Sequence, residues 1–393
     1  MSAGLEERLR SELREREAPD EPAAEARSWA VAEAAFAERS PARRRPRPLV
    51  RVALVTALLA VALAALLTPA GAEVGEWIEN RIGLGPEESQ PTLRGFPGGG
   101  RLLAVSDSGA WVVNPGGGVR RLGDYREVGW SPRGLFIVGT RGRRITAMEP
   151  DGEPRWSFSR PGRLSHPAWS SGDGFRIAYL ERRGVRVVDG SGGLDHAVAA
   201  GAARVTPAWR PGRAYVLTYA SGSGVVTVDA DTGRRLWRTR TGATPIALGW
   251  SRDGRRLAAL TPRGLFVLAR DGGLVARRGL PAGARALAMA LHPRVRRAAV
   301  AYVRNGVSSV ISTTLALGPS RDLFTGSGTF RELAWSPNGR RLLIGWPEAN
   351  QWLLIGDGRP RAFAGMSRQL DPGATGAGFP RISGWCCGPS RAG

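Results

Sequence analysis

The pattern of hydrophobic and polar positions repeats about every 40 residues along residues 96–393. Each copy places a small residue and a tryptophan before a polar turn, and an apolar strand follows the turn. The clear copies carry Trp130, Trp169, Trp209, Trp250 and Trp335, and a degenerate copy has Leu291 at the tryptophan position. A unit of short strands with this period is typical of the blade of a β-propeller.

A second hairpin follows the tryptophan-bearing one, marked by turn residues that favour a positive or preset φ. It occurs seven times, at Asn114-Pro115-Gly116, Pro150-Asp151-Gly152, Asp189-Gly190, Asp231-Thr232-Gly233, Asp271-Gly272, Gly318-Pro319-Ser320 and Asp357-Gly358. Seven hairpins predict an all-β, seven-bladed β-propeller over 96–393, whereas a six-bladed ring, the alternative, leaves one hairpin unplaced. The first unit begins at residues 101–107 without its own copy of the repeated tryptophan strand, and strand 381–387 carries a lone copy with Trp385. We therefore predict that strand 381–387 closes the ring by completing the blade of residues 101–123.

The repeated tryptophans have a packing interpretation and a functional one. A propeller tapers toward its axis, and a large aromatic at a fixed position of the inner strand fills the wedge between two blades. The alternative is that these rings form an aromatic cage for a ligand. We predict packing, because the residue recurs in almost every blade.

A second pattern, a long apolar run, predicts a membrane segment over 49–72. Residues 52–67 carry no charge and span about 24 Å as a helix, and continuation to Ala72 gives spanning length. Five arginines precede the run within 41–51, and the acidic Glu73 and Glu76 follow it. This asymmetry places the N-terminus in the cytoplasm and the propeller outside it.

A cleaved signal peptide is the rival interpretation of the same run, since Ala70-Gly71-Ala72 fits a small-residue cleavage site. The long stretch before the apolar run favours an uncleaved, single-pass signal anchor. A buried core helix is the third interpretation, but no second helical element surrounds the run to bury all its faces. In the first two interpretations the body leaves the cytoplasm.

The segments on either side of the apolar run are helical in pattern. Residues 1–48 contain two short amphipathic helices, the first with Leu5, Leu9 and Leu13 at a spacing of four, followed by an arginine-rich link. We predict a cytoplasmic tail that is solvated or contacts a cytoplasmic regulator. Residues 73–95 are expected to form an interfacial helix and a linker.

The charge of the chain, +22, resides in the propeller. Residues 96–393 carry 43 arginines against 19 acids, and the chain has no lysine. Codon bias toward arginine and a selected basic surface are both open explanations. An exported domain does not meet nucleic acid, so anionic lipid headgroups or acidic envelope polymers are the expected anionic partners.

A family resemblance supports the same architecture. The motif W-S-P-N-G-R-R-L at residues 335–342 resembles the WD40-like propeller repeats of TolB-type proteins. That resemblance implies an interaction platform and covers most of 96–393. The layout of residues 1–85 resembles membrane-anchored bacterial propeller proteins related to anti-sigma regulators, although residues 1–48 lack the zinc-binding His/Cys pattern of many anti-sigma domains.

Candidate chemistry is sparse. Residues 221–224 lack the first glycine of a nucleophile elbow, and His166, His196 and His292 show no metal-ligand spacing, with His292 expected in a surface turn. Cys386 and Cys387 can form a vicinal disulfide or remain free thiols, and strand alternation favours no bond. We predict no catalytic, cofactor-binding or metal-binding residues, and no cofactor.

One segment keeps an enzymatic alternative open. Residues 228–237 resemble the D-x-x-T-G-x-x-x-W segment of quinone-dependent dehydrogenase blades, and residues 148–156 resemble it faintly. The simpler interpretation is a capped hairpin turn. The predicted function is a non-catalytic, membrane-tethered extracytoplasmic platform that binds or senses an envelope partner, a protein or an anionic component. The alternatives are an anti-sigma-like regulator acting through 1–48 and an exported quinone-dependent propeller enzyme.

Overall fold

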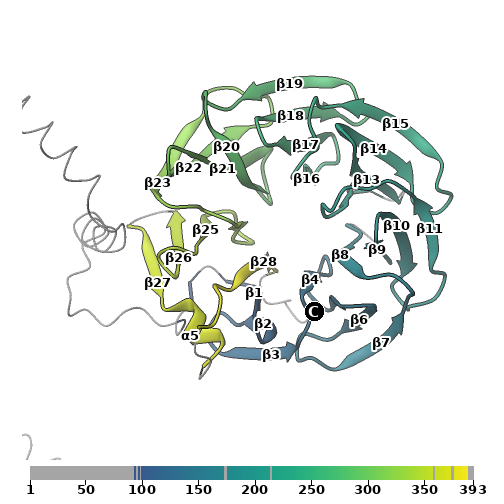
Figure 1. The fold of residues 1–393 in the computed structure, drawn as a ribbon, viewed down its shortest axis with the longest axis horizontal. Coiled ribbons are helices and arrows are strands. Elements are labelled where there is room, and N and C mark those ends of the chain that lie inside the picture. Colours follow the sequence, from purple (N-terminus) through teal and green to yellow (C-terminus); the bar gives the residue numbers. More distant parts are fainter. Residues whose placement is uncertain are drawn as a thin grey trace, which may run out of the picture. The chain divides into compact units, whose positions relative to one another are not determined.

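The computed structural model describes residues 93, 96–97, 99–171, 175–212, 215–356, 359–372 and 376–387. These residues form seven four-stranded antiparallel sheets, arranged as blades around a central axis (Figure 1). The seven-bladed prediction is confirmed, and the six-bladed alternative is wrong.

The blades follow one another along the chain, and six of them use four consecutive strands. Blade 1 contains β28 (Arg381–Cys386), β1 (Arg101–Ser106), β2 (Gly109–Val113) and β3 (Val119–Gly123), and blade 2 contains β4 (Glu127–Trp130), β5 (Ile137–Arg141), β6 (Arg144–Met148) and β7 (Pro154–Ser159). Blade 3 contains β8 (Leu164–Trp169), β9 (Arg176–Glu181), β10 (Gly184–Asp189) and β11 (His196–Ala199), and blade 4 contains β12 (Ala208–Trp209), β13 (Val216–Ser221), β14 (Gly224–Asp229) and β15 (Arg235–Arg240). Blade 5 contains β16 (Ala247–Trp250), β17 (Arg256–Thr261), β18 (Gly264–Ala269) and β19 (Leu274–Gly279). Blade 6 contains β20 (Arg285–Leu291), β21 (Arg297–Arg304), β22 (Val307–Thr314) and β23 (Arg321–Ser327), and blade 7 contains β24 (Leu333–Trp335), β25 (Arg341–Trp346), β26 (Gln351–Gly356) and β27 (Arg361–Ala364).

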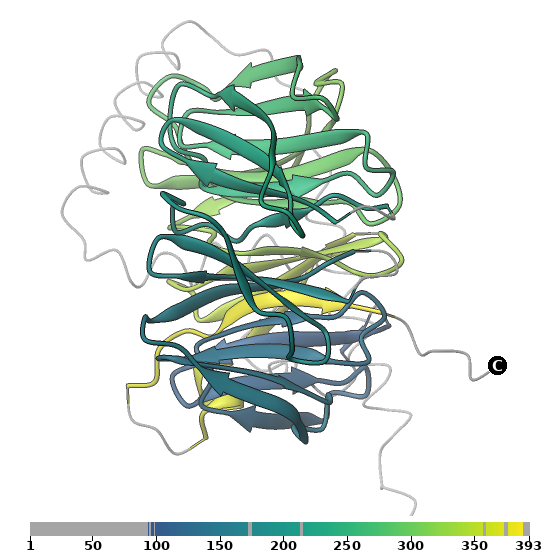
Figure 2. The ribbon, with the colours of Figure 1, turned by 90° about the vertical axis from the view of Figure 1, so that its right-hand side faces the viewer.

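Blade 1 closes the ring by exchanging a strand. Its inner strand is β28 from the C-terminal end, which pairs antiparallel with β1, so that Leu102 faces Trp385 and Val105 faces Arg381. Figure 2 shows this yellow strand beside the blue strands of the first blade. The predicted closure by strand 381–387 is therefore confirmed.

Every blade buries both of its faces. The described core consists of seven clusters, one between each pair of adjacent blades. Strand β1 shows how one sequence serves two interfaces: Leu102 and Ala104 pack toward blade 7, whereas Leu103 and Val105 pack toward blade 2. Because successive side chains point to opposite faces, a strand with a neighbour on each side must be apolar at consecutive positions.

The residues that follow each tryptophan build the first turn of the blade. The serine after the tryptophan is buried in four blades, and its hydroxyl accepts a hydrogen bond from the backbone N–H five residues later at Ser131, Ser251 and Ser336 and six residues later at Ser170. Glycine with positive φ completes this turn at Gly134, Gly254 and Gly339, where its N–H donates to the serine carbonyl. The Trp-Ser motif is thus explained by turn geometry.

The repeated tryptophans lie on the inner strands and join neighbouring blades. The indole N–H of Trp209 donates to the carbonyl of Ala168 at 2.9 Å, and that of Trp335 to the carbonyl of Ala290 at 3.3 Å. In both pairs the acceptor belongs to the inner strand of the preceding blade. The packing interpretation is confirmed for these rings.

The chain enters the propeller at the interface between blades 7 and 1. Leu93 and Phe96 are buried there, and the Phe96 ring lies 5.0 Å from Trp385 and 5.2 Å from Phe363. The short helix α5 (Met366–Leu370) packs in the same cluster. Leu93, which falls within the segment 73–95 predicted as helix and linker, is therefore part of the propeller core.

The other N-terminal predictions concern segments outside the described residues. These are the tail 1–48, the anchor 49–72 and the helix at the start of 73–95. Among the residues that the structure does describe, no helix has the length and apolar character needed to cross a membrane.

Cys386 and Cys387 form a disulfide, so the prediction that alternation disfavours a bond is wrong. Strand β28 ends at Cys386, and Cys387 has a φ of 46°, outside the extended region. The rule that neighbouring side chains point to opposite faces therefore no longer applies. Both sulfurs lie over Gly134, where a Cβ would be 3.1 Å from Cys387 Sγ and 3.3 Å from Cys386 Sγ. The pair thus packs against the first turn of blade 2.

The closing strand can be tested by truncation. A chain ending at Pro380 lacks β28 and exposes the blade 1 faces that Ile382 and Trp385 cover. We expect it to lose at least the roughly 3–5 kcal/mol that removal of one buried tryptophan costs. Thermal unfolding followed by circular dichroism measures the loss. The matched control is a chain ending at Cys387, which keeps β28; equal unfolding temperatures for the two truncations would contradict the closure.

Candidate functional site

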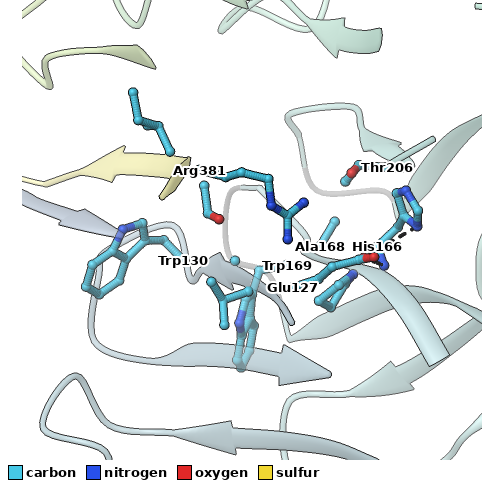
Figure 3. Close-up of a pocket in the computed structure, with 12 residues that line it drawn as sticks. Glu127, Trp130, His166, Ala168, Trp169, Thr206 and Arg381 are labelled. Carbon is cyan, nitrogen blue, oxygen red and sulfur yellow. Dashed lines mark hydrogen bonds and ion pairs between the residues drawn. The ribbon is translucent and has the colours of Figure 1, made fainter. Parts of the chain in front are cut away.

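A cavity of about 440 Å³ lies beside the axis, where the inner strands of blades 1, 2 and 3 begin. It is lined by β4, β8, β28 and the segment before β12; the lining residues are Glu127, Val128, Gly129, Trp130, His166, Pro167, Ala168, Trp169, Thr206, Arg381, Ile382 and Ser383. Figure 3 shows Arg381, Glu127 and His166 converging on this space from three blades. Its volume suits a small ligand or the end of a peptide.

Two irregular strands shape the cavity. In β8, His166 and Pro167 together oppose a single residue of β9, and in β28 Ser383 is the extra residue opposite β1. Such β-bulges re-aim side chains and are common next to functional sites. Both bulged segments line the cavity.

His166 has an unusual backbone conformation. Its φ is 54°, and it precedes Pro167, a combination that sterics disfavour for a non-glycine residue. The conformation is held by Glu127, because the His166 backbone N–H donates to Glu127 Oε2. The ring Nδ1 lies 3.4 Å from the same oxygen. Strain of this kind, about 1–3 kcal/mol, concentrates at functional sites.

The charge of the His166 ring depends on opposing influences. Burial lowers its pKa most strongly, Glu127 opposes this, and the positive charges of Arg204 and Arg381 lower the pKa further. The net shift is downward from the ordinary value, so the imidazole is neutral at neutral pH. It therefore offers one donor and one acceptor rather than a cation.

Arg381 supplies the positive charge of the cavity. It is the first residue of β28, and its Nη2 donates to the carbonyl of Arg126 at 2.7 Å. In Figure 3 its guanidinium points into the space between Glu127 and Thr206. Within the described residues it forms no ion pair.

Three consecutive blades carry a charged residue at the same inner-strand position. Glu332, Arg381 and Glu127, in blades 7, 1 and 2, each lie opposite the next-to-last residue of the adjacent strand. Glu332 is largely buried, and its Oε2 has no partner among the described residues. Burial raises the pKa of Glu332 to about 7, against the lowering effect of Arg381 and Arg331. Near neutral pH this carboxyl is partly protonated.

The other predicted candidates lie apart from the cavity. His196 Nε2 is 2.9 Å from the carbonyl of Ala230, and His292 Nε2 is 3.0 Å from the carbonyl of Gly339. His292 occupies the turn after β20, as predicted, and its ring packs against Trp335 at a tilt of 58°. No cluster of three His, Cys, Asp or Glu residues with metal-binding geometry occurs in the part of the chain that the structure describes.

The segment that resembles quinone-dependent enzymes forms a hairpin turn and a blade contact. Asp229 caps the turn by accepting hydrogen bonds from the N–H groups of Asp231 and Thr232. Trp237 then donates from its indole to the carbonyl of Arg270 in blade 5. Trp156, at the end of the fainter copy, donates in the same way to Gly190 of blade 3. The capped-turn interpretation is confirmed.

A signal for this site is present in the sequence at a fixed distance from the repeated tryptophans. Glu127, His166, Thr206 and Glu332 each lie three residues before the repeat tryptophan of their blade. At the corresponding offset, blades 5 and 6 have Ala247 and Ala288. A polar residue three positions before the repeat tryptophan therefore identifies the blades whose inner strands place polar or charged side chains next to the axis.

Comparison with known proteins places the fold in a family. The family model described as outer membrane protein assembly factor BamB matches residues 98–312. The chain belongs to this family of PQQ-type propellers. A comparison with curated protein sequences gives no match.

Solved structures resemble this BamB-family propeller in fold. The β-propeller domain of Cps50 (Swd1) from Myceliophteria thermophila has a TM-score of 0.55 and 12% identity, covering 67% of this chain and 97% of that one. The C-terminal WD40 domain of Sif2 has a TM-score of 0.48 and 12% identity over 67% and 77% of the two chains. Hydrazine synthase of Kuenenia stuttgartiensis has a TM-score of 0.47 and 15% identity over 59% and 76%. The match to the Cps50 (Swd1) propeller confirms the WD40-like resemblance as one of fold, and the comparisons do not bear on the anti-sigma resemblance.

The raised pKa of Glu332 predicts a pH-dependent stability in this BamB-family propeller. The stability from protonated Glu332 is fully present below pH 4.5 and is lost as the pH rises through about 7. Glu332→Gln cannot ionise, so we expect it to be more stable than wild type above pH 7 by roughly 1–3 kcal/mol. The two should converge toward pH 4.5.

Urea unfolding between pH 4.5 and pH 8 measures this difference. Glu153→Gln, at an exposed hairpin turn, is the matched control and should follow wild type at every pH. A constant difference between Glu332→Gln and wild type across the range would show that Glu332 ionises freely in the folded protein.

Proposed function

We propose that the protein is a non-catalytic, membrane-tethered platform that binds an envelope partner outside the cytoplasm through the axial cavity of blades 1–3. The observation that carries this is the convergence of Glu127, His166 and Arg381 from three blades on one cavity, with two bulged strands shaping it. The family supports it, since an outer membrane protein assembly factor acts on other envelope proteins.

The tether is supported by sequence and by the way the chain enters the ring. The apolar run 52–67 and its five preceding arginines suit a single-pass anchor with the N-terminus in the cytoplasm. Leu93 and Phe96 are fixed in the interface of blades 7 and 1.

The non-catalytic role is supported by the contacts of the two segments that resemble quinone-dependent enzymes. Trp156 and Trp237 both serve as contacts to the next blade at the outer side of the ring, away from the axial cavity. These contacts support a packing role for the two segments.

The topology can be tested in cells with alkaline phosphatase fused after Gly393, because this reporter is active only outside the cytoplasm. We expect an active fusion with the wild-type chain. Replacing Arg43, Arg44, Arg45, Arg47 and Arg51 with glutamine should lower phosphatase activity per molecule, since the arginine bias that orients the segment is removed. The matched control replaces five arginines of the propeller surface; an inactive wild-type fusion would refute the export of the propeller.

Partner binding at the axial cavity can be tested by photocrosslinking in intact cells. A benzophenone amino acid at Thr206, which is exposed and lines the cavity, should give a discrete adduct with an envelope protein. The same amino acid at Thr325, exposed on the outer strand of blade 6, is the matched control and should not. Equal adducts from both positions, or none from Thr206, would contradict the axial site.

A further inference from the structure

The axial cavity combines hydrogen-bond donors with a single lining carboxylate. Arg381, Ser383 and Thr206 contribute donors, and all three are exposed at the cavity. The one carboxylate in the lining, Glu127, already accepts a hydrogen bond from the His166 backbone N–H. The hydrogen-bonding groups that remain available to a ligand are therefore mainly donors, and they suit a ligand that carries an acceptor group.

The charges around the cavity favour a negative ligand. The fields of Arg204 and Arg381 reach His166, and those of Arg331 and Arg381 reach Glu332. Against these three cations stand two carboxylates, of which Glu332 is partly protonated near neutral pH. A concave site with excess positive charge concentrates anions.

Arg381 has N–H donors that remain available to a ligand. A guanidinium carries five N–H donors, and the described contacts use one of them, on the carbonyl of Arg126. An arginine with a free N–H edge can hold a carboxylate by two parallel hydrogen bonds. No ion pair in the described part of the chain competes for it.

The size and walls of the cavity indicate what carries the anionic group. About 440 Å³ is more space than a single inorganic ion needs, and Trp130 and Trp169 form part of the wall. Aromatic walls beside a cluster of donors suit a side chain or chain end that is apolar along its length and charged at its tip. An extended peptide segment has this construction.

We infer that the cavity binds the carboxylate of an extended peptide segment from the envelope partner, held by Arg381 with support from Ser383, Thr206 and His166. This inference rests on the proposed function and specifies the chemistry of its site. The carboxylate belongs to an acidic side chain or to a C-terminus, two sources of the same chemistry.

Isothermal titration calorimetry of the full-length chain in detergent tests the inference with three acetylated pentapeptides. The first carries an internal glutamate and an amidated C-terminus, the second has glutamine in its place, and the third is neutral in its side chains with a free C-terminal carboxylate. Binding of the first peptide identifies a side-chain carboxylate, and binding of the third identifies a chain end. The glutamine peptide should bind roughly tenfold more weakly or not at all.

The variant Arg381→Gln should raise the dissociation constant of the bound peptide roughly tenfold or more, and Arg381→Lys less, because lysine keeps the charge without the planar pair of donors. The matched control is Arg285→Gln, since Arg285 begins β20, the inner strand of blade 6, on the other side of the ring. It should bind as wild type does. Unfolding temperatures of all variants establish that they are folded.

Three results would overturn the inference: equal binding by Arg381→Gln and wild type, binding of the glutamine peptide as tightly as whichever carboxylate-bearing peptide binds, or binding of inorganic phosphate by a site that binds none of the peptides. The cellular crosslink from Thr206 separates this from the proposed function. An adduct that persists undiminished in Arg381→Gln overturns the carboxylate inference alone, whereas a wild-type chain without an adduct overturns the proposed function.

Discussion

The burial of both faces of every blade is the constraint from which the rest of this structure follows. A strand such as β1, with Leu102, Leu103, Ala104 and Val105 in sequence, cannot leave either face in water without exposing apolar surface. Each sheet therefore needs two neighbours, and only a closed ring gives two neighbours to all seven. The outermost strands, which face solvent at their edge, instead carry exposed arginines such as Arg235, Arg238 and Arg277, which discourage further strand pairing.

Several interactions that close the ring occur together around blade 1. Strand β28 completes blade 1, Leu93 and Phe96 fill the interface with blade 7, and the disulfide of Cys386 and Cys387 packs on the turn of blade 2. The axial cavity lies directly beside this closure, and its guanidinium comes from the closing strand itself. The site therefore exists only in the closed ring, which couples its geometry to the integrity of the fold.

Much of the fold could be predicted because its causes are local. The spacing of Trp130, Trp169 and Trp209 reports the blade period, and turns such as Asp271-Gly272 report hairpins, since both depend on residues close in the chain. The closing role of Trp385 could be predicted because it is the one copy without a partner. The vicinal disulfide could not, because it depends on the φ of a single residue after the strand ends.

The site was harder to foresee, because it depends on residues from separate blades. Glu127 and His166 are 39 positions apart, and nothing near either residue in the chain indicates that a bulge turns His166 onto the Glu127 carboxylate. Arg381 reaches the same space only through the exchanged strand.

The sequence alone determined the repeat, the strand order and the residue that closes the ring, because these follow from periodicity and turn chemistry within one blade. The tertiary structure alone decided which inner-strand positions meet at the axis and what charge they present. The physical reason is that burial, backbone strain at His166 and the fields of neighbouring arginines arise only when the blades are packed together.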